Sequence, residues 1–148
     1  MDNYPEKAEK LFKDGYSCSQ AVLGAYCSHL GMDFETAIKL SSSFGGGMGR
    51  LREVCGAVSA MFMVAGLKTG YTDPRDSISK QKHYELIQFL SKKFKDENGS
   101  IICRELLGLD VHHDEAKPSA RTVEYYKKRP CVELVRCASE ILDEVLFE

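Results

Sequence analysis

The sequence lacks an apolar run long enough to cross a membrane. Its longest apolar segment, Val54 to Leu67, is shorter than the roughly 20 residues that a transmembrane helix needs. The charged N-terminal segment 1–15 also lacks the apolar core and the small-residue cleavage site of a secretory signal. We therefore expect a cytoplasmic protein that has no membrane partner.

A strong excess of charge of either sign is also missing. The 20 basic and 22 acidic residues give a formal net charge of -2 at pH 7, which gives no reason to expect nucleic acid as a partner. A hydrophobic fraction of 43% and a charged fraction of 28% are typical of globular proteins. A chain of 148 residues can bury about two-thirds of its unfolded surface, so we expect one domain over residues 1–148.

Strand-like alternation is absent, whereas signals for helix starts and ends recur along the chain. Ser17 and Gln20 form a capping box, and proline or aspartate stands where other helices should begin. The main predicted helices cover 5–13, 18–30, 34–40, 53–67, 74–97 and 130–145, with two short ones near 101–108 and 120–128. The sequence predicts an all-α bundle of five or six helices. The apolar 53–67 segment should be its buried central helix.

Six cysteines are many for a reducing compartment, where structural disulfides seldom persist. Cysteine can simply act as a small buried hydrophobic residue, which is the plainest interpretation of each one taken alone. Four of the six, however, fall near predicted helix starts: Cys18, Cys55, Cys103 and Cys131. This recurrence favours a chemical role.

A helix start favours a thiolate over a thiol. Unpaired N–H groups and the positive end of the helix dipole lower the pKa of a cysteine there, and nearby cations lower it further. Cys55 follows Arg50 and Arg52, and Cys131 follows Arg129. We therefore expect Cys55 to be the most acidic thiol of the four and to be ionised for part of its working life. Thiolates attack disulfides and bind metals.

A glycine-rich loop, FGGGMG, precedes Cys55. It matches neither a P-loop, which needs G-x-x-x-x-G-K-[ST], nor a dinucleotide fingerprint, which needs a preceding strand. Its N–H groups can form an anion-binding nest, which makes Gly46, Gly47 and Arg50 candidate cofactor-binding residues. The interpretation that we favour is a shaped turn that aims Cys55 inward.

Several blocks together resemble a known family. They are YSCSQAV, FGGGMGR leading into CGAVSAMFMVAGL, CRELLG, and a cysteine entering the last helix. The chain is similar to redox-active proteins named for their C_GCAxxG_C_C pattern, although the order of its central block, which reads CGAVSA from Cys55 to Ala60, differs from the family's name, and a glycine would be expected where Ala60 stands. The resemblance maps the family's cysteines onto Cys18, Cys55, Cys103 and Cys131 and implies redox or metal chemistry at those residues. Similar cysteine-bearing domains occur beside haem modules in some cytochromes. The resemblance is therefore also consistent with an electron-transfer centre in this chain.

Three functions stay open at this point. In the first, two or more of the four cysteines exchange thiol and disulfide, with a redox partner protein, although no C-x-x-C pair is present. In the second, the four thiolates hold zinc or an iron–sulfur cluster as the cofactor. In the third, the protein is a structural bundle whose cysteines are only core residues.

The remaining cysteines and the histidines carry weaker signals. Cys27 shares a stripe with apolar residues and should be buried, whereas Cys137 shares a face with glutamates and should be partly exposed. His29 should lie near the site or at a helix end, and His83 on a mixed helix face. The His112 and His113 pair lies in an acidic loop and is more typical of an exposed loop than of a metal site.

Overall fold

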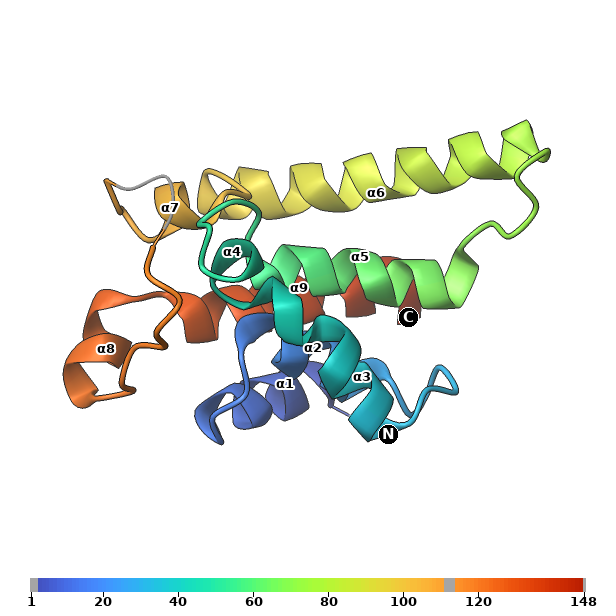
Figure 1. Cartoon of the computed structure of the whole chain (residues 1–148). Coiled ribbons are helices and arrows are strands. Elements are labelled where there is room, and N and C mark those ends of the chain that lie inside the picture. The colour runs from blue at the N-terminus through green and yellow to red at the C-terminus, as the bar shows by residue number, and fades with distance from the viewer. Residues whose placement is uncertain (1–2, 111–113, 148) are drawn as a thin grey trace.

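The computed structural model describes residues 3–110 and 114–147, without the side chains of residues 126–128. Within this part of the chain there is no β-strand (Figure 1). The helices of eight residues or more are α1 (Tyr4–Lys13), α2 (Cys18–Tyr26), α3 (Phe34–Ser41), α5 (Gly56–Thr69), α6 (Ser77–Asn98) and α9 (Cys131–Leu142). Shorter elements are η1 (Ser42–Phe44), α4 (Gly45–Met48), α7 (Cys103–Leu106), α8 (Val123–Lys128) and the π-helical η2 (Asp143–Phe147). The predicted all-α fold is confirmed, and only the short helices raise the count above six.

Side chains at the helix starts explain where the first helices begin. The predicted capping box of α2 is present: the Ser17 N–H donates to Gln20 Oε1 at 3.1 Å, and the Gln20 N–H donates to Ser17 Oγ at 3.3 Å. Asp33 caps α3 in the same way, through the N–H of Thr36 at 3.0 Å. These local bonds fix the start of α2, and hence the position of Cys18.

Three predicted helix boundaries were wrong. The second helix ends at Tyr26, not near Leu30, because the chain closes there in tight turns. The central helix starts at Gly56 because the preceding residues are extended, with Val54 in an isolated antiparallel bridge to Ile102. The longest helix starts at Ser77, since Asp76 caps it by accepting the N–H of Ser79 at 3.0 Å.

The core forms around α5, as predicted for the central helix. Its fully buried side chains are Ala57, Val58, Ala60, Met61, Val64 and Ala65. Helix α2 packs on one side of α5 and α6 on another, while α9 packs against both α1 and α5 (Figure 1). The long α6 buries only Leu90 and Phe94, so it covers the core with a narrow stripe.

No helix in the described part of the chain combines the length and the apolar character needed to span a membrane. The long α6 is charged on its outer face, and the apolar α5 has 14 residues.

Candidate functional site

The four predicted cysteines all stand at helix starts. Cys18 is the first residue of α2, Cys131 of α9 and Cys103 of α7, while Cys55 is the residue that precedes α5. The remaining two cysteines do not: Cys27 follows the end of α2, and Cys137 lies inside α9. The pattern expected from the sequence is therefore present, even though α5 begins later than predicted.

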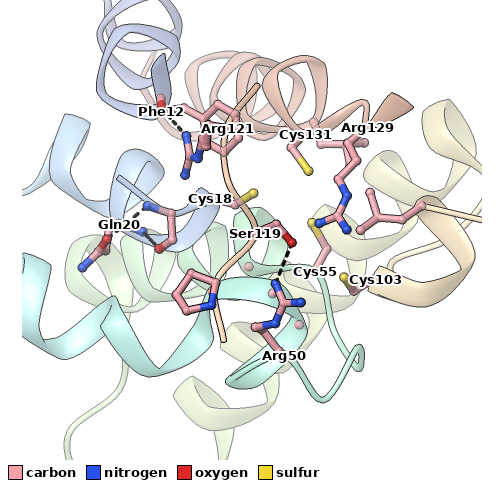
Figure 2. A pocket seen from close by; sticks show the side chains of 18 of the residues that line it. Phe12, Cys18, Gln20, Arg50, Cys55, Cys103, Ser119, Arg121, Arg129 and Cys131 are labelled. Carbon is pink, nitrogen blue, oxygen red and sulfur yellow. Dashed lines mark hydrogen bonds between the residues drawn. The ribbon is translucent and has the colours of Figure 1, made fainter. Parts of the chain in front are cut away.

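These four cysteines line one cavity of about 780 Å³, together with the glycine loop and several arginines (Figure 2). The sulfurs reach it from separate helices, because the starts of α2, α5, α7 and α9 gather at one end of the bundle (Figure 1). Three of the four cysteines are buried and Cys18 is partly exposed. Cys27 and Cys137 do not line this cavity; as predicted, Cys27 is buried and Cys137 is partly exposed.

Cys18 and Cys131 form a close pair across the starts of α2 and α9. The Cys18 thiol donates a hydrogen bond to the Cys131 sulfur, and this bond is the main reason that the pKa of Cys131 falls to about 7. The same bond, together with burial, raises the pKa of Cys18 well above its usual value. One proton is thus shared by two sulfurs, which leaves Cys131 as the thiolate of the pair.

Three further side chains favour the Cys131 thiolate. The positive charges of Arg129 and Arg121 and a hydrogen bond from the Tyr125 hydroxyl each lower the pKa of Cys131. Arg129 also stacks over the Tyr125 ring, with its guanidinium 5.0 Å from the ring centroid. The sequence pointed to Arg129 because it stands two residues before Cys131. It gave no signal for Tyr125, which lies on α8, or for Arg121, which lies in the segment before α8.

The expectation that Cys55 is the most acidic thiol was wrong. Burial raises the pKa of Cys55 to about 12 and outweighs the N–H groups of Ala57 and Val58, which lower it. The two arginines expected beside Cys55 extend elsewhere. Arg52 reaches Cys103 and Arg50 reaches the segment 114–119, so neither guanidinium pairs with the Cys55 sulfur.

Cys103 has Arg52 as its partner. Arg52 is 1% exposed, and its Nη1 donates to Cys103 Sγ at 3.6 Å while its Nη2 donates to Asp114 Oδ2 at 3.0 Å. Burial nevertheless raises the pKa of Cys103, although the Arg52 hydrogen bond lowers it. The same arginine holds the pKa of Asp114 below its usual range. Arg52 therefore fixes Cys103 in place without making it acidic.

The glycine loop is a shaped turn. Gly46, Gly47 and Gly49 have positive φ, and so do the non-glycine residues Met48, Arg50 and Arg52. The N–H groups of residues 50 to 53 all donate to carbonyls of the loop itself, so those amides are not open to an anion. A Cβ on Gly47 would lie 2.6 Å from Cys103 Cβ and 2.8 Å from Arg52 Cα. The loop thus packs directly against Cys103.

Arg50 uses its side chain to hold the segment 114–119 over the cavity. Its guanidinium donates to the Glu115 carbonyl at 2.6 Å, to Ser119 Oγ at 3.2 Å and to Asp114 Oδ2 at 3.1 Å. Gly46, Gly47 and Arg50 all line the cavity, so their cofactor-binding role stays a prediction. Sequence reasoning missed Asp114, because its partners are more than 60 residues away in the chain.

The histidines lie away from the cavity or outside the described residues. His29 contacts the rings of Tyr4 and Phe147 at the far end of α2, which agrees with a helix-end position. His83 lies on α6, half-buried and beside a small separate cavity. His112 and His113 lie outside the described residues. Within residues 3–110 and 114–147 no three histidine, cysteine or acidic side chains form a group that could hold a metal ion.

The sequence matches, over residues 16–145, the family model described as putative redox-active protein (C_GCAxxG_C_C). The chain belongs to this family. No curated protein and no solved structure matches it. The matched residues 16–145 include the four cysteines that line the cavity, Cys18, Cys55, Cys103 and Cys131.

Proposed function

We propose that this protein is a thiol redox protein in which Cys131 and Cys18 cycle between a dithiol and a disulfide. The observation that carries the proposal is that both sulfurs line one cavity at the starts of α2 and α9, where their mutual interaction lowers the pKa of Cys131 and raises that of Cys18. Two neighbouring thiols in one cavity, one ionised and one protonated, are what disulfide exchange requires in the absence of a C-x-x-C motif.

The chemistry follows from the different protonation of the two sulfurs. The Cys131 thiolate attacks one sulfur of a substrate disulfide R–S–S–R, forms a mixed disulfide and expels RS⁻. The Cys18 proton passes to that RS⁻, and the new Cys18 thiolate attacks Cys131 Sγ and expels the second RS⁻. Two electrons move from the dithiol to the substrate, which leaves one RSH, one RS⁻ and a Cys18–Cys131 disulfide. A dithiol reductant, such as a redox partner protein, would return the pair to its reduced form.

Cys55 and Cys103 complete the wall of the same cavity but carry raised pKa values. Their assignment as catalytic residues or metal ligands stays a prediction. Zinc or an iron–sulfur cluster would need three or four of the cysteines as ligands, and the described residues contain no such ligand group. The exchange reaction needs only the Cys131 and Cys18 pair, which favours it over the metal function.

The proposal is tested by equilibrating the protein with buffers of defined thiol–disulfide potential and mapping the disulfide by mass spectrometry. We expect a reversible Cys18–Cys131 disulfide. Cys131→Ser should abolish it, and Cys18→Ser should trap a mixed disulfide on Cys131. Cys137→Ser, a cysteine on the same helix α9 but outside the cavity, is the matched control and should behave like the wild type. A Cys131→Ser variant that keeps a reversible couple of the same potential would overturn the proposal.

A further inference from the structure

The cavity is lined by an excess of basic side chains. Its only carboxylate among the described residues is that of Asp14, which forms an ion pair with Lys10 at 2.9 Å. Its basic residues are Lys13, Arg50, Arg52, Arg121 and Arg129. A cavity with this charge attracts anions, and low-dielectric walls strengthen the attraction.

Some of these charges are already balanced. Lys13 pairs with Glu9 at 3.3 Å, and Arg50 and Arg52 share the single carboxylate of Asp114 at 3.1 and 3.0 Å. That shared pairing leaves one positive charge in excess. The segment 114–119 therefore neutralises only part of the positive charge that the glycine loop brings to the cavity.

Arg121 and Arg129 have no carboxylate at ion-pair distance in the described part of the chain. Arg121 donates to the carbonyls of Phe12 and Tyr16, which are neutral acceptors. Arg129 lies over the Tyr125 ring. Figure 2 shows both arginines beside the cysteines, drawn among the side chains that line the cavity. Even with Cys131 ionised, about two positive charges of the lining have no carboxylate partner among the described residues.

We propose that the substrate of this site is a small disulfide that carries one or two carboxylates, with Arg129 as the main carboxylate-binding residue. This inference rests on the proposed thiol exchange and adds its substrate class. Arg129 stands two residues before Cys131, so one small molecule can place its carboxylate at the guanidinium and its S–S bond at the thiolate. An arginine can bind a carboxylate through two parallel hydrogen bonds, which would also orient the substrate.

The position of the sulfurs favours a small substrate over a folded protein. Cys131 is 7% exposed, and it lies in the wall of a cavity, not on a protruding surface. A volume of about 780 Å³ is within the usual range of small-molecule sites, roughly 300–1,000 Å³. A disulfide in a folded protein would have to leave its own surface to reach this thiolate.

Three small disulfides of similar length but different charge test the proposal: dianionic 3,3′-dithiodipropionate, neutral hydroxyethyl disulfide and dicationic cystamine. Rates of oxidation of the fully reduced protein are measured at pH 7 and low ionic strength. A thiolate in water repels the dianion and attracts the dication. In this cavity we expect the opposite order, with the dianion at least about tenfold faster than the neutral disulfide, as expected for a steering cleft. Added salt should reduce the difference.

Variants of Arg129 assign this preference to its charge. Arg129→Gln should lower the ratio of anionic to neutral rate by about fivefold or more, and Arg129→Lys should retain most of it. The ratio is the informative quantity, because a less acidic Cys131 slows all three reactions alike. Arg75→Gln is the control, since Arg75 is 91% exposed, lies before α6 and does not line the cavity. It should leave the ratio unchanged.

Two kinds of failure are distinguishable. If the protein reacts with all three disulfides at similar rates, or fastest with cystamine, anion selection is wrong while thiol exchange survives. An unchanged ratio in Arg129→Gln likewise removes Arg129 from substrate binding. If none of the three oxidises the Cys18–Cys131 pair, the proposed function fails, and the substrate class fails with it.

Discussion

Cys131 and Cys55 occupy the same kind of place in the chain, at the start of a core helix and shortly after one or two arginines, yet their acidities diverge. The Cys131 pKa falls to about 7 because Cys18 donates to its sulfur and arginine charges lie nearby. The Cys55 pKa rises to about 12 because burial is not offset by any charged partner. A helix start alone therefore does not make a thiolate, since desolvation exceeds the contribution of the helix N–H groups.

The region around Cys55 and the region around Cys131 also differ in the contacts that fix their structure. The Cys55 and Cys103 region is fixed by backbone contacts and by one buried arginine: the Cys55 N–H donates to the Ile101 carbonyl at 2.8 Å, Gly47 packs against Cys103, and Arg52 donates to Cys103 Sγ. The Cys18 and Cys131 region is held by side chains that can exchange partners, namely the thiol of Cys18 and the hydroxyl of Tyr125. We infer that the first region is scaffold and the second is reactive, and three predictions test this division.

The largest expected effect is in the alkylation rate. At pH 7 about half of Cys131 is thiolate, whereas a pKa of about 12 leaves Cys55 almost entirely protonated. The intrinsically stronger nucleophilicity of a less acidic thiolate offsets part of this difference, so we expect Cys131 to react at least about 100-fold faster with iodoacetamide. Peptide-resolved mass spectrometry between pH 5 and 10 measures both rates.

The direction of the pH dependence is fixed by the same values. The Cys131 rate should rise from pH 5 to about 8 and then level off, because its lowered pKa lies near 7. The Cys55 rate should still be rising at pH 10, since its raised pKa lies near 12. Cys137, whose pKa is also raised to about 12, is an internal control on α9 and should follow Cys55. Equal alkylation rates for Cys131 and Cys55 at pH 7 would contradict the inference that one region is reactive and the other is scaffold.

The cysteines and the helix starts also show how much of the structure the sequence alone could predict. Local signals predicted the fold and the helix-start position of Cys18. These signals are the capping box at Ser17, the residues that start and end the helices, and the apolar α5 segment. The four cysteines line a common cavity because the helix starts that carry them gather at one end of the bundle. The local sequence pattern was sufficient to predict the structure wherever the deciding contacts join residues that are close together in the chain.

What the sequence could not predict depends on long-range contacts. Arg52 was expected to serve Cys55, three residues away, but its guanidinium bonds Cys103 and Asp114, which are 51 and 62 residues away. Arg121, whose charge favours the Cys131 thiolate, is held by the carbonyl of Tyr16, which is 105 residues away. The direction in which a long side chain extends, and the depth at which a sulfur is buried, are set by tertiary packing. Both decide a cysteine pKa, so the ranking of the thiols was wrong.

A second prediction compares two glycines of the same loop. Gly47→Ala should destabilise the protein by about 2–4 kcal/mol, through left-handed backbone strain together with a clash against Cys103 and Arg52. Gly49→Ala is the matched control: its φ of +60° is similar to the +70° of Gly47, but the nearest atom to its Cβ would be Ser43 O at 3.8 Å. It should cost only about 1–2 kcal/mol. Urea unfolding measures both, and equal losses would show that the loop does not pack tightly on Cys103.

The smallest expected effect concerns a single hydroxyl. Tyr125→Phe removes the O–H that donates to Cys131 and keeps the ring under Arg129. A net hydrogen bond contributes about 0.5–1.5 kcal/mol, so the Cys131 thiolate should become less populated and its alkylation at pH 6.5 about threefold to tenfold slower. The rate is measured on the same peptide as before.

The pH at which the Tyr125→Phe difference disappears separates acidity from structure. Above about pH 9 Cys131 is ionised with or without the Tyr125 hydroxyl, because Cys18 and the two arginines still favour its thiolate. The variant and the wild type should therefore converge there. A rate deficit that persists at pH 9.5 would mean that the hydroxyl positions Cys131 or controls access to it. Convergence, by contrast, would place Tyr125 with Cys18 among the groups that make the start of α9 reactive while the start of α5 stays inert.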